Sequence, residues 1–400
     1  MNHTFRLGHS RLLLLAVIAL FLASACAPSR IGTAWPALAN VTIQEQPRVF
    51  VTYNNWAIAL NPSTGKAAEL LDTEGNVRED VNGAPRKWEL DGNANGLGNA
   101  QFYSQPVLRE LDGQQQFLLP SHTNKLILVD PLTARVDNPT GEVMSGPIVA
   151  NIAEDEQNYF VPFDNHDLAA LDKETLAVNW RYVTTSGVWS SPVFVDGVVY
   201  FATIDHNVYA VNAADGTLLW DAPVNTGGLV GSSPLVADGF VYVGNTLDKL
   251  VKIDAATGEI VIETKLKNWI WSSPVIADGL LYVSDLSGYV YAIDPDDLSI
   301  VWEVQASSRG IRPSPLVTEN HVIVASRDGK VHWLNRNDGS VAYVREIEGA
   351  PEVLSDLLLV PANEAAGINE SLVLVASLNM SHLVVAFTEE TATQRWVYAR

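Results

Sequence analysis

The sequence predicts an all-β protein in which a four-stranded unit recurs about every 41 residues, and three features predict it. The first is a Ser-Pro pair whose prolines lie 42, 40 and 41 residues apart. These pairs are Ser191-Pro192, Ser233-Pro234, Ser273-Pro274 and Ser314-Pro315. The second is an Asp-Gly pair between two apolar runs, which indicates a β-hairpin because tight turns need positive φ. It follows the first three Ser-Pro pairs, as Asp196-Gly197, Asp238-Gly239 and Asp278-Gly279.

The third feature is a polar residue that ends the third strand of each expected unit. This marker residue occurs eight times, at Asn61, Asp130, Asp172, Asn212, Asp254, Asp294, Asn335 and Thr388. The five intervals from Asp130 to Asn335 are 42, 40, 42, 40 and 41 residues. Four short antiparallel strands in ~41 residues are the period of a propeller blade. We therefore predict that residues 34–400 form a single domain, an eight-bladed β-propeller of four-stranded antiparallel blades.

The strands of each unit are expected in a fixed order. The innermost strand begins at the Ser-Pro pair, the second follows the Asp-Gly turn, the third ends at the marker and the fourth follows a further turn. The innermost strands are expected to begin near Pro36, Pro106, Pro147, Pro192, Pro234, Pro274, Pro315 and Asp356. The first marker interval is 69 residues and the last is 53, so the end blades carry insertions. We interpret residues 67–85 as the insertion before the outer strand of the first blade.

The segment 210–220 (Ala-Val-Asn-Ala-Ala-Asp-Gly-Thr-Leu-Leu-Trp) resembles the repeat of the PQQ-like eight-bladed propellers, the quinoprotein alcohol dehydrogenase-like fold. Segments 253–258 and 292–302 are similar to the same repeat, and the resemblance covers roughly residues 34–398. It implies that a Trp late in each blade docks against the next blade. The matching residues, eight positions after their markers, are Trp180, Trp220, Trp302 and Trp396, with Tyr343 in the seventh blade. In the first blade, Trp88 is expected to take this role, although it lies 27 residues after Asn61 because of the insertion. Ile262 in blade five and Asn138 in blade two depart from this pattern.

The N-terminus is predicted to be a targeting segment. An apolar run of 11 residues, 12–22, follows Arg11 and is shorter than the ~20 residues that span a bilayer. The stretch Leu22-Ala23-Ser24-Ala25-Cys26 resembles the lipobox of bacterial lipoproteins. That resemblance implies that residues 1–25 are a signal peptide, that Cys26 carries a diacylglycerol, and that residues 26–33 are a lipidated tether. The alternative is an ordinary signal peptide cut near Ala25.

Charge and cysteine content exclude several classes of function. The chain has 46 acidic and 25 basic residues and a formal net charge of −21, which argues against nucleic acid as a partner because phosphate backbones need dense cationic patches. A single cysteine excludes an intrachain disulfide, a Cys-rich zinc site and an iron–sulfur cluster.

The family resemblance raises the question of a quinone cofactor. PQQ dehydrogenases use calcium held by acidic and amide side chains, a catalytic Asp, a Trp under the quinone and an adjacent Cys–Cys disulfide, which a chain with one cysteine cannot form. Trp189 and Trp271 precede Ser-Pro pairs near the predicted channel. We interpret them as packing residues, with stacking on a flat ligand as the alternative. No catalytic residue, cofactor or metal ligand is assigned.

Two groups of polar residues are candidates for metal binding. His166 and His206 hold a position where blades six and seven have Gly288 and Gly329, so we interpret this position as a hairpin turn. Asp91, Asn93 and Asn95 match the start of a calcium loop, but its twelfth position is Phe102 instead of Glu. We interpret this segment as a surface loop, with calcium binding at Asp91, Asn93 and Asn95 as the alternative.

Two functions from different classes remain. The first is a non-enzymatic, lipid-anchored propeller that binds envelope proteins, because the chain resembles the propeller lipoprotein of the β-barrel outer-membrane protein assembly machine. It would be held on a bacterial membrane and face away from the cytoplasm, at the outer membrane or the cell surface. The second is a PQQ-dependent or other small-molecule dehydrogenase or binding protein that uses the propeller channel.

The lipid anchor is tested at Cys26. We expect Cys26→Ser to abolish fatty-acid labelling and membrane partitioning, because no other apolar stretch approaches ~20 residues and an acidic surface is repelled by anionic lipids. Folding should be unchanged, since Cys26 precedes the first repeat. Metabolic labelling with a fatty acid is the measurement, and an unlabelled wild-type protein would rule the anchor out.

Overall fold

A computed structural model describes residues 35–400, except 73, 98–99 and 139–141. The expected signal peptide, Cys26 and the tether lie outside the described residues. Residues Trp35–Arg400 form one compact unit. Among the described residues, no helix has the length and apolar character needed to cross a membrane.

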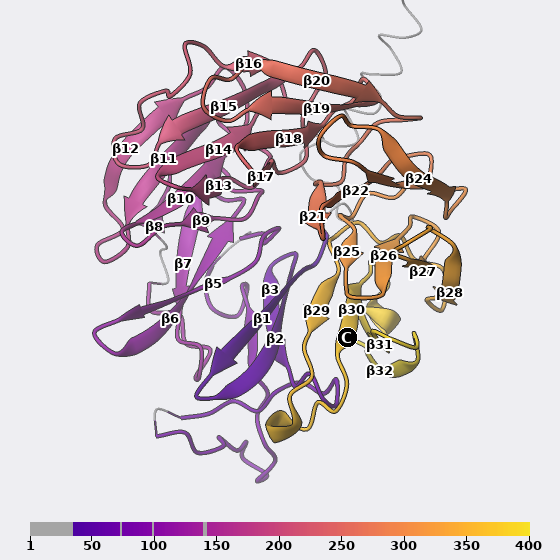
Figure 1. The fold of residues 1–400 in the computed structure, drawn as a ribbon. Coiled ribbons are helices and arrows are strands. Elements are labelled where there is room, and N and C mark those ends of the chain that lie inside the picture. The colour runs from indigo at the N-terminus through magenta and orange to yellow at the C-terminus, as the bar shows by residue number, and fades with distance from the viewer. Residues whose placement is uncertain (1–34, 73, 98–99, 139–141) are drawn as a thin grey trace, which may run out of the picture. The chain divides into compact units, whose positions relative to one another are not determined.

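Eight four-stranded antiparallel sheets follow one another in chain order, which confirms the predicted eight-bladed propeller (Figure 1). The first four blades comprise β1 (Ala37–Ile43), β2 (Gln46–Tyr53), β3 (Trp56–Leu60), β4 (Glu89–Asp91); β5 (Val107–Leu111), β6 (Gln114–Ser121), β7 (Lys125–Val129), β8 (Glu142–Val143); β9 (Ala153–Glu154), β10 (Asn158–Phe163), β11 (Asp167–Asp172), β12 (Val178–Val183); β13 (Val193–Val195), β14 (Val198–Ala202), β15 (Asn207–Asn212) and β16 (Val224–Asn225). The last four comprise β17 (Leu235–Ala237), β18 (Phe240–Gly244), β19 (Lys249–Asp254), β20 (Ile260–Lys265); β21 (Val275–Ala277), β22 (Leu280–Ser284), β23 (Tyr289–Ile293), β24 (Ile300–Gln305); β25 (Leu316–Val317), β26 (His321–Ala325), β27 (Lys330–Asn335), β28 (Val341–Glu346); β29 (Leu358–Val360), β30 (Leu372–Ala376), β31 (Val384–Thr388) and β32 (Gln394–Tyr398). Two 3₁₀ turns, η1 (Glu364–Ala366) and η2 (Met380–His382), lie in blade 8.

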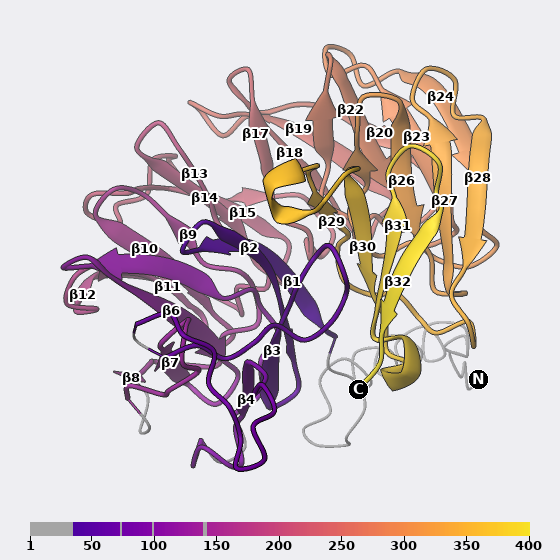
Figure 2. The same cartoon turned by 90° about the horizontal axis from the view of Figure 1, so that it is seen from below.

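The hydrophobic core lies between the blades. Each of seven clusters of buried side chains draws residues from two successive blades; one contains Tyr200 and Trp220 of blade 4 with Val241 and Val251 of blade 5. The innermost strand β29 of blade 8 contacts β1 of blade 1, which brings the two ends of the repeat together. Figure 2 shows blade 8 (yellow) beside blade 7.

The turns have the conformations that their residues favour. Asp196 and Gly197, between β13 and β14, have φ of 48° and 82°, and the other two Asp-Gly pairs are similar. His166 and His206 have φ of 79° and 83° in the turns between the second and third strands. These values confirm that their shared position is a hairpin turn.

Most blades are joined to the next by one recurrent hydrogen bond. Its acceptor is the backbone carbonyl that follows the marker residue of the next blade. In four blades its donor is the indole of the Trp that stands eight residues after the marker of its own blade. These bonds are Trp180 Nε1 to Ala213 O (2.9 Å), Trp220 Nε1 to Ala255 O (3.0 Å), Trp302 Nε1 to Arg336 O (2.9 Å) and Trp396 Nε1 to Pro62 O (2.9 Å). A glycine in the accepting turn leaves room for the indole ring. At Gly258, where φ is +76°, a Cβ would lie only 2.8 Å from Trp220 Cδ2.

In three other blades, the donor to the same carbonyl position is a side chain of the third strand or of the innermost strand. In blade 7, Trp333 Nε1 donates to Glu389 O (2.9 Å), so the docking residue is Trp333 of β27, whereas Tyr343 packs near His321. In blade 5, where Ile262 lacks a donor, Lys252 Nζ donates to Pro295 O (2.7 Å).

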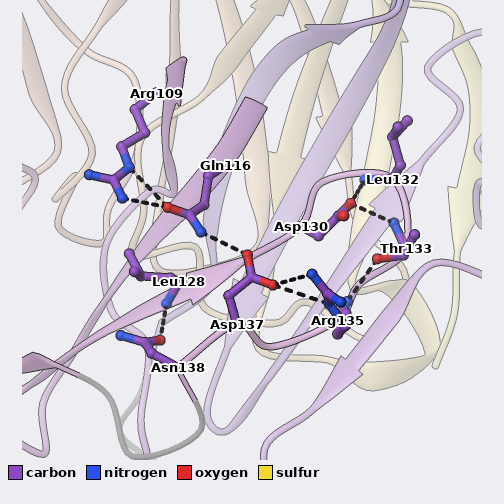
Figure 3. A network of polar contacts seen from close by, with 9 residues as sticks. All are labelled: Arg109, Gln116, Leu128, Asp130, Leu132, Thr133, Arg135, Asp137 and Asn138. Carbon is purple, nitrogen blue, oxygen red and sulfur yellow. Dashed lines mark hydrogen bonds and ion pairs between the residues drawn. The ribbon is translucent and has the colours of Figure 1, made fainter. Parts of the chain in front are cut away.

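Blade 2 is the third of these blades. Arg109 Nη1 donates to Lys173 O at 3.0 Å. Figure 3 shows Arg109 with its partners within blade 2. Asn138, which occupies the position of the Trp, bonds back to its own blade, where its Oδ1 accepts from Leu128 N at 2.7 Å. Gln116 accepts from Arg109 and donates to Asp137, and this network holds the guanidinium in place.

The first blade contains the insertion between β3 and β4. Trp88 precedes β4, is 2% exposed and packs edge-on against Phe50 (5.0 Å) and against Phe117 of blade 2 (6.3 Å between ring centroids). Its Nε1 has no hydrogen-bond partner among the described residues. A bond from Leu71 N in the insertion to Leu132 O (3.1 Å) joins the two blades instead.

Two predicted starts of innermost strands need correction. The innermost strand of blade 3 is β9, which begins at Ala153, so Pro147 was wrong by six residues. The extra residues belong to the connection from blade 2, and Pro147 is not equivalent to the other prolines. Strand β29 begins at Leu358, two residues after Asp356, because this blade has no proline to mark the start.

We expect Trp220→Ala to destabilise the fold by ~3–5 kcal/mol, because it leaves a cavity between blades 4 and 5. Trp220→Phe should cost about 1–3 kcal/mol, since the Ala255 carbonyl loses its partner. The matched control is Trp269→Ala, which truncates a ring that is 37% exposed. Chemical denaturation measures all three, and equal losses for Trp220→Ala and Trp269→Ala would contradict the docking role.

A second prediction concerns pH. His332 in β27 is 4% exposed, neither ring nitrogen has a hydrogen-bond partner among the described residues, and burial lowers its pKa. The unfolded chain therefore binds a proton near pH 6.5 that the folded chain resists, so stability falls as pH drops below that value. We expect His332→Leu to flatten the decline of unfolding free energy between pH 7 and 5. Parallel wild-type and variant curves would contradict this.

Candidate functional site: the ring axis and the crossover face

A belt of hydrogen bonds joins the starts of the innermost strands. In six successive steps, a backbone N–H donates to the side-chain oxygen of the equivalent residue in the next blade. The steps are Gln105 N to Asn151 Oδ1 (2.9 Å), Asn151 N to Ser191 Oγ (3.1 Å), Ser191 N to Ser233 Oγ (3.0 Å), Ser233 N to Ser273 Oγ (3.0 Å), Ser273 N to Ser314 Oγ (3.1 Å) and Ser314 N to Asp356 Oδ1 (2.6 Å). The Ser of each Ser-Pro pair is therefore a link between blades.

A second set of equivalent residues lies two positions before the belt. Its members are Tyr103, Val149, Trp189, Gly231, Trp271, Arg312 and Leu354. The Arg312 guanidinium carbon lies 4.6 Å from the ring centroid of Trp35 and 5.1 Å from that of Trp271, a cation–π arrangement with both rings. Burial, and then the charge of Arg327, lower the pKa of Arg312 to about 10, so the side chain is still a cation at pH 7.

The two Trp residues singled out in the sequence are both engaged by protein side chains. Trp189 Nε1 donates to Asp164 Oδ1 at 2.5 Å, and Trp271 faces Arg312. A calcium-bound quinone would need acidic and amide oxygens around the metal ion, whereas a guanidinium repels a divalent cation. The residues at this position therefore do not fit a PQQ–calcium group.

The segment that resembles a calcium loop forms a turn within blade 1. Asp91 Oδ1 accepts from the backbone N–H groups of Asn93 (2.8 Å) and Ala94 (3.1 Å), and Asn95 Nδ2 donates to Asp91 O (2.8 Å). Gly92 packs closely, since a Cβ there would lie 2.6 Å from Asn55 O. Among the described residues, no three His, Cys, Asp or Glu side chains are grouped to hold a metal ion.

The crossover face is the end of the ring that carries the connections from each outer strand to the next inner strand. In blade 5 this face presents two exposed apolar side chains, Leu247 (49% exposed) and Trp269 (37% exposed). Their segments are joined by bonds from Leu266 N to Asp248 O (2.7 Å) and from Ile270 N to Asn245 O (3.1 Å). Exposed apolar side chains on neighbouring, fixed loops are typical of protein contacts.

The sequence analysis did not single out Arg312, Leu247 or Trp269. Arg312 stands at the same offset before a Ser-Pro pair as Trp189 and Trp271, so comparison of the repeats could have found it. Leu247 occupies a turn position, where exposure can be judged only once the hairpin is placed. The lipidation residue Cys26 lies outside the described residues.

Residues 134–234 and 205–399 match the family model PQQ_2, described as "Outer membrane protein assembly factor BamB". The comparison with curated protein sequences returned no match. Among solved structures, BamB from Moraxella catarrhalis has a TM-score of 0.62 and 15% identity, with 87% of this chain and 95% of that chain covered. The computationally designed protein Ika8 has a TM-score of 0.63 and 12% identity, with 92% and 98% covered.

The two structural likenesses support the eight-bladed fold alone, because their sequence identities are low. The family model, in contrast, matches more than half of the chain and includes blades 3 to 8. The chain therefore belongs to the PQQ_2 family, the family of the outer membrane protein assembly factor BamB.

Proposed function

We propose that this protein is a non-enzymatic lipoprotein of the bacterial envelope that acts as a protein-binding scaffold in the assembly of outer-membrane or surface proteins. The observation that carries the proposal is its membership of the BamB family, established over residues 134–399. The lipobox-like stretch that ends at Cys26 supports a membrane anchor at the start of the mature chain.

The residues at the ring axis weigh against the alternative of a quinone-dependent enzyme. A PQQ dehydrogenase needs the face of a Trp for the quinone and oxygen ligands for its calcium ion. Here Arg312 lies over Trp271, and Asp164 accepts the indole N–H of Trp189. This arrangement supports a scaffold in which protein partners bind to surfaces away from the ring axis.

We assign the principal partner contact to Leu247 and Trp269 on the crossover face. The other strongly exposed large apolar side chains among the described residues lie on or beside outer strands or in the insertion of blade 1. A partially exposed Trp with a neighbouring aliphatic side chain is the composition of an interface hot spot. An envelope protein would cover both side chains with its own apolar surface.

The test is site-specific photo-crosslinking in cells of the native host. A photoreactive residue at position 247 or 269 should crosslink to an outer-membrane or surface protein, or to a factor that assembles one. Position 174, which is exposed on blade 3, is the control. Crosslinking at all three positions alike, or at none, would contradict the proposed contact.

A paired variant measures the contribution of this contact. We expect Leu247→Asp combined with Trp269→Ala to weaken the purified complex about 30-fold, the effect of losing one interface hot spot. Val301→Asp is the control, because Val301 is 53% exposed on the outer strand β24. If Val301→Asp alone disrupts the complex, the partner binds the outer edge and the crossover-face assignment is wrong.

A further inference from the structure

The chain enters the ring at its axis, on the crossover face. Strand β1 is the innermost strand of blade 1, and innermost strands begin at the crossover face, so the residues before Ala37 lie at that end. Trp35 contacts two other blades there. Its ring lies 5.2 Å from that of Tyr103, which precedes blade 2, and 4.6 Å from the guanidinium carbon of Arg312, which precedes blade 7. Blade 8 separates blades 7 and 1, so these contacts meet near the centre of the ring.

These contacts fix the point at which the N-terminal chain leaves the ring. Arg312 also faces Trp271 of the connection to blade 6, with 5.1 Å from its guanidinium carbon to the ring centroid. The cation is therefore held by two indoles, and Trp35 is held in turn by Arg312 and Tyr103. The chain before Trp35 starts from the axis and not from the rim.

The chain between Trp35 and the expected lipid is short. Cys26 lies nine residues before Trp35. Nine residues span at most ~32 Å, whatever conformation they adopt. A compact unit as long as Trp35–Arg400 has a radius of gyration of ~21 Å, which corresponds to a sphere with a radius of ~27 Å. A tether that starts at the axis needs most of its reach to arrive at the rim, and it cannot also pass along the side of the ring to the opposite end.

Acidic residues gather at that opposite end, here called the turn face. Antiparallel strands place there the connection between the first and second strands of each blade and the turn between the third and fourth. Every connection between a first and a second strand contains an acidic residue. These residues include Glu45, Asp112, Asp155, Asp196, Asp238, Asp278, Glu319 and Glu364. An anionic bilayer repels this end of the protein.

The crossover connections have the opposite character. The connections from a fourth strand to the next first strand contain neither Asp nor Glu, except the one from β28 to β29. Two of them contain basic residues, namely Lys267, Arg309 and Arg312. Carboxylates do occur in the turns between second and third strands on this face, where Asp164 and Asp285 accept hydrogen bonds from Trp189 and Tyr291. The crossover face is therefore the end that an anionic membrane repels less.

We propose that the short axial tether turns the crossover face towards the membrane that holds the lipid, an inference that rests on the anchor at Cys26 in the proposed function. The axis at this face then lies within ~32 Å of the lipid, and the acidic turn face lies on the far side. Leu247 and Trp269 lie on the near side. The partner must therefore reach them with a segment close to the membrane surface, which requires a partner that is embedded in the same membrane or held on it.

The test measures energy transfer from a dye on the protein to acceptor-labelled lipid headgroups. Residues 26–400, which contain the complete compact unit, are coupled to a maleimide lipid at Cys26, the only cysteine of the chain, and bound to phosphatidylcholine vesicles. An unnatural amino acid carries the dye at position 247 on the crossover face or at position 297, which is exposed on the turn face. With an acceptor of short transfer range, we expect transfer from position 247 and none above background from position 297. Equal transfer from both, or stronger transfer from position 297, would overturn the proposal.

The matched control keeps the dyes and the lipid and lengthens the tether. A flexible Gly-Ser insertion of ~40 residues between Thr33 and Ala34 has a mean span of ~35 Å of its own. This reach frees the ring to turn over, so transfer from the two positions should become similar, and thermal unfolding should show that all labelled proteins are folded. If position 247 still dominates with the longer tether, a direct contact with lipid orients the ring and the tether does not, which would also overturn the proposal.

This test is separate from that of the proposed anchor. The coupled lipid replaces the natural one, so the orientation is measured whether or not the cell acylates Cys26. Fatty-acid labelling of the natural protein, with equal transfer from positions 247 and 297, would keep the anchor and reject the orientation. Transfer from position 247 alone, with no natural label, would support the orientation that the tether imposes and reject the anchor.

Discussion

The contacts between blades depend on one backbone carbonyl, which in seven of the eight blades is the one that follows the marker at the end of the third strand. Seven side chains of three residue types reach it from the preceding blade: Arg109, Trp180, Trp220, Lys252, Trp302, Trp333 and Trp396. The donors differ in chemistry and strand, so the turn, and not the donor, is the fixed element. A buried carbonyl left unpaired costs about 1–3 kcal/mol, which gives each interface a reason to supply some N–H group.

The sequence was sufficient to predict the features that depend on the turns, namely the number of blades and the order of their strands. Asp-Gly pairs and marker residues act locally, since an Asp or Asn side chain caps its own turn, as Asp254 Oδ1 does by accepting from Thr257 N at 2.8 Å. Blade number and strand order followed from them. The sequence did not identify Lys252, Arg109 or Trp333 as donors, because a long side chain can reach the same carbonyl from several strands. Arg312 was missed for a related reason: its stacking between Trp35 and Trp271 joins residues far apart in the chain.

The two ends of the ring have different chemistry, and the strand directions explain the difference. Asx-type turns after the third strands gather carboxylates and amides, such as those of Asp338, Asn337 and Glu390, at the end opposite the crossover face. At the other end, the turn between β18 and β19 exposes Leu247, and the crossover from β20 to β21 exposes Trp269.

Closure of the ring requires side-chain contacts, because each blade takes its four strands from one continuous stretch of chain. Within residues 35–400, as far as they are described, no N-terminal strand joins blade 8, whose sheet runs from β29 to β32. Trp396 donates to Pro62 O, and Gly65 makes room for the indole, since a Cβ there would lie 2.4 Å from the ring. At the axis, the serine belt ends at Asp356, and the equivalent position in blade 1 is Trp35, which has no side-chain oxygen and stacks on Arg312 instead. The outer margin of the junction between the first and last blades is thus held by the indole of Trp396, whereas at the axis Trp35 of blade 1 contacts Arg312, which precedes the innermost strand of blade 7.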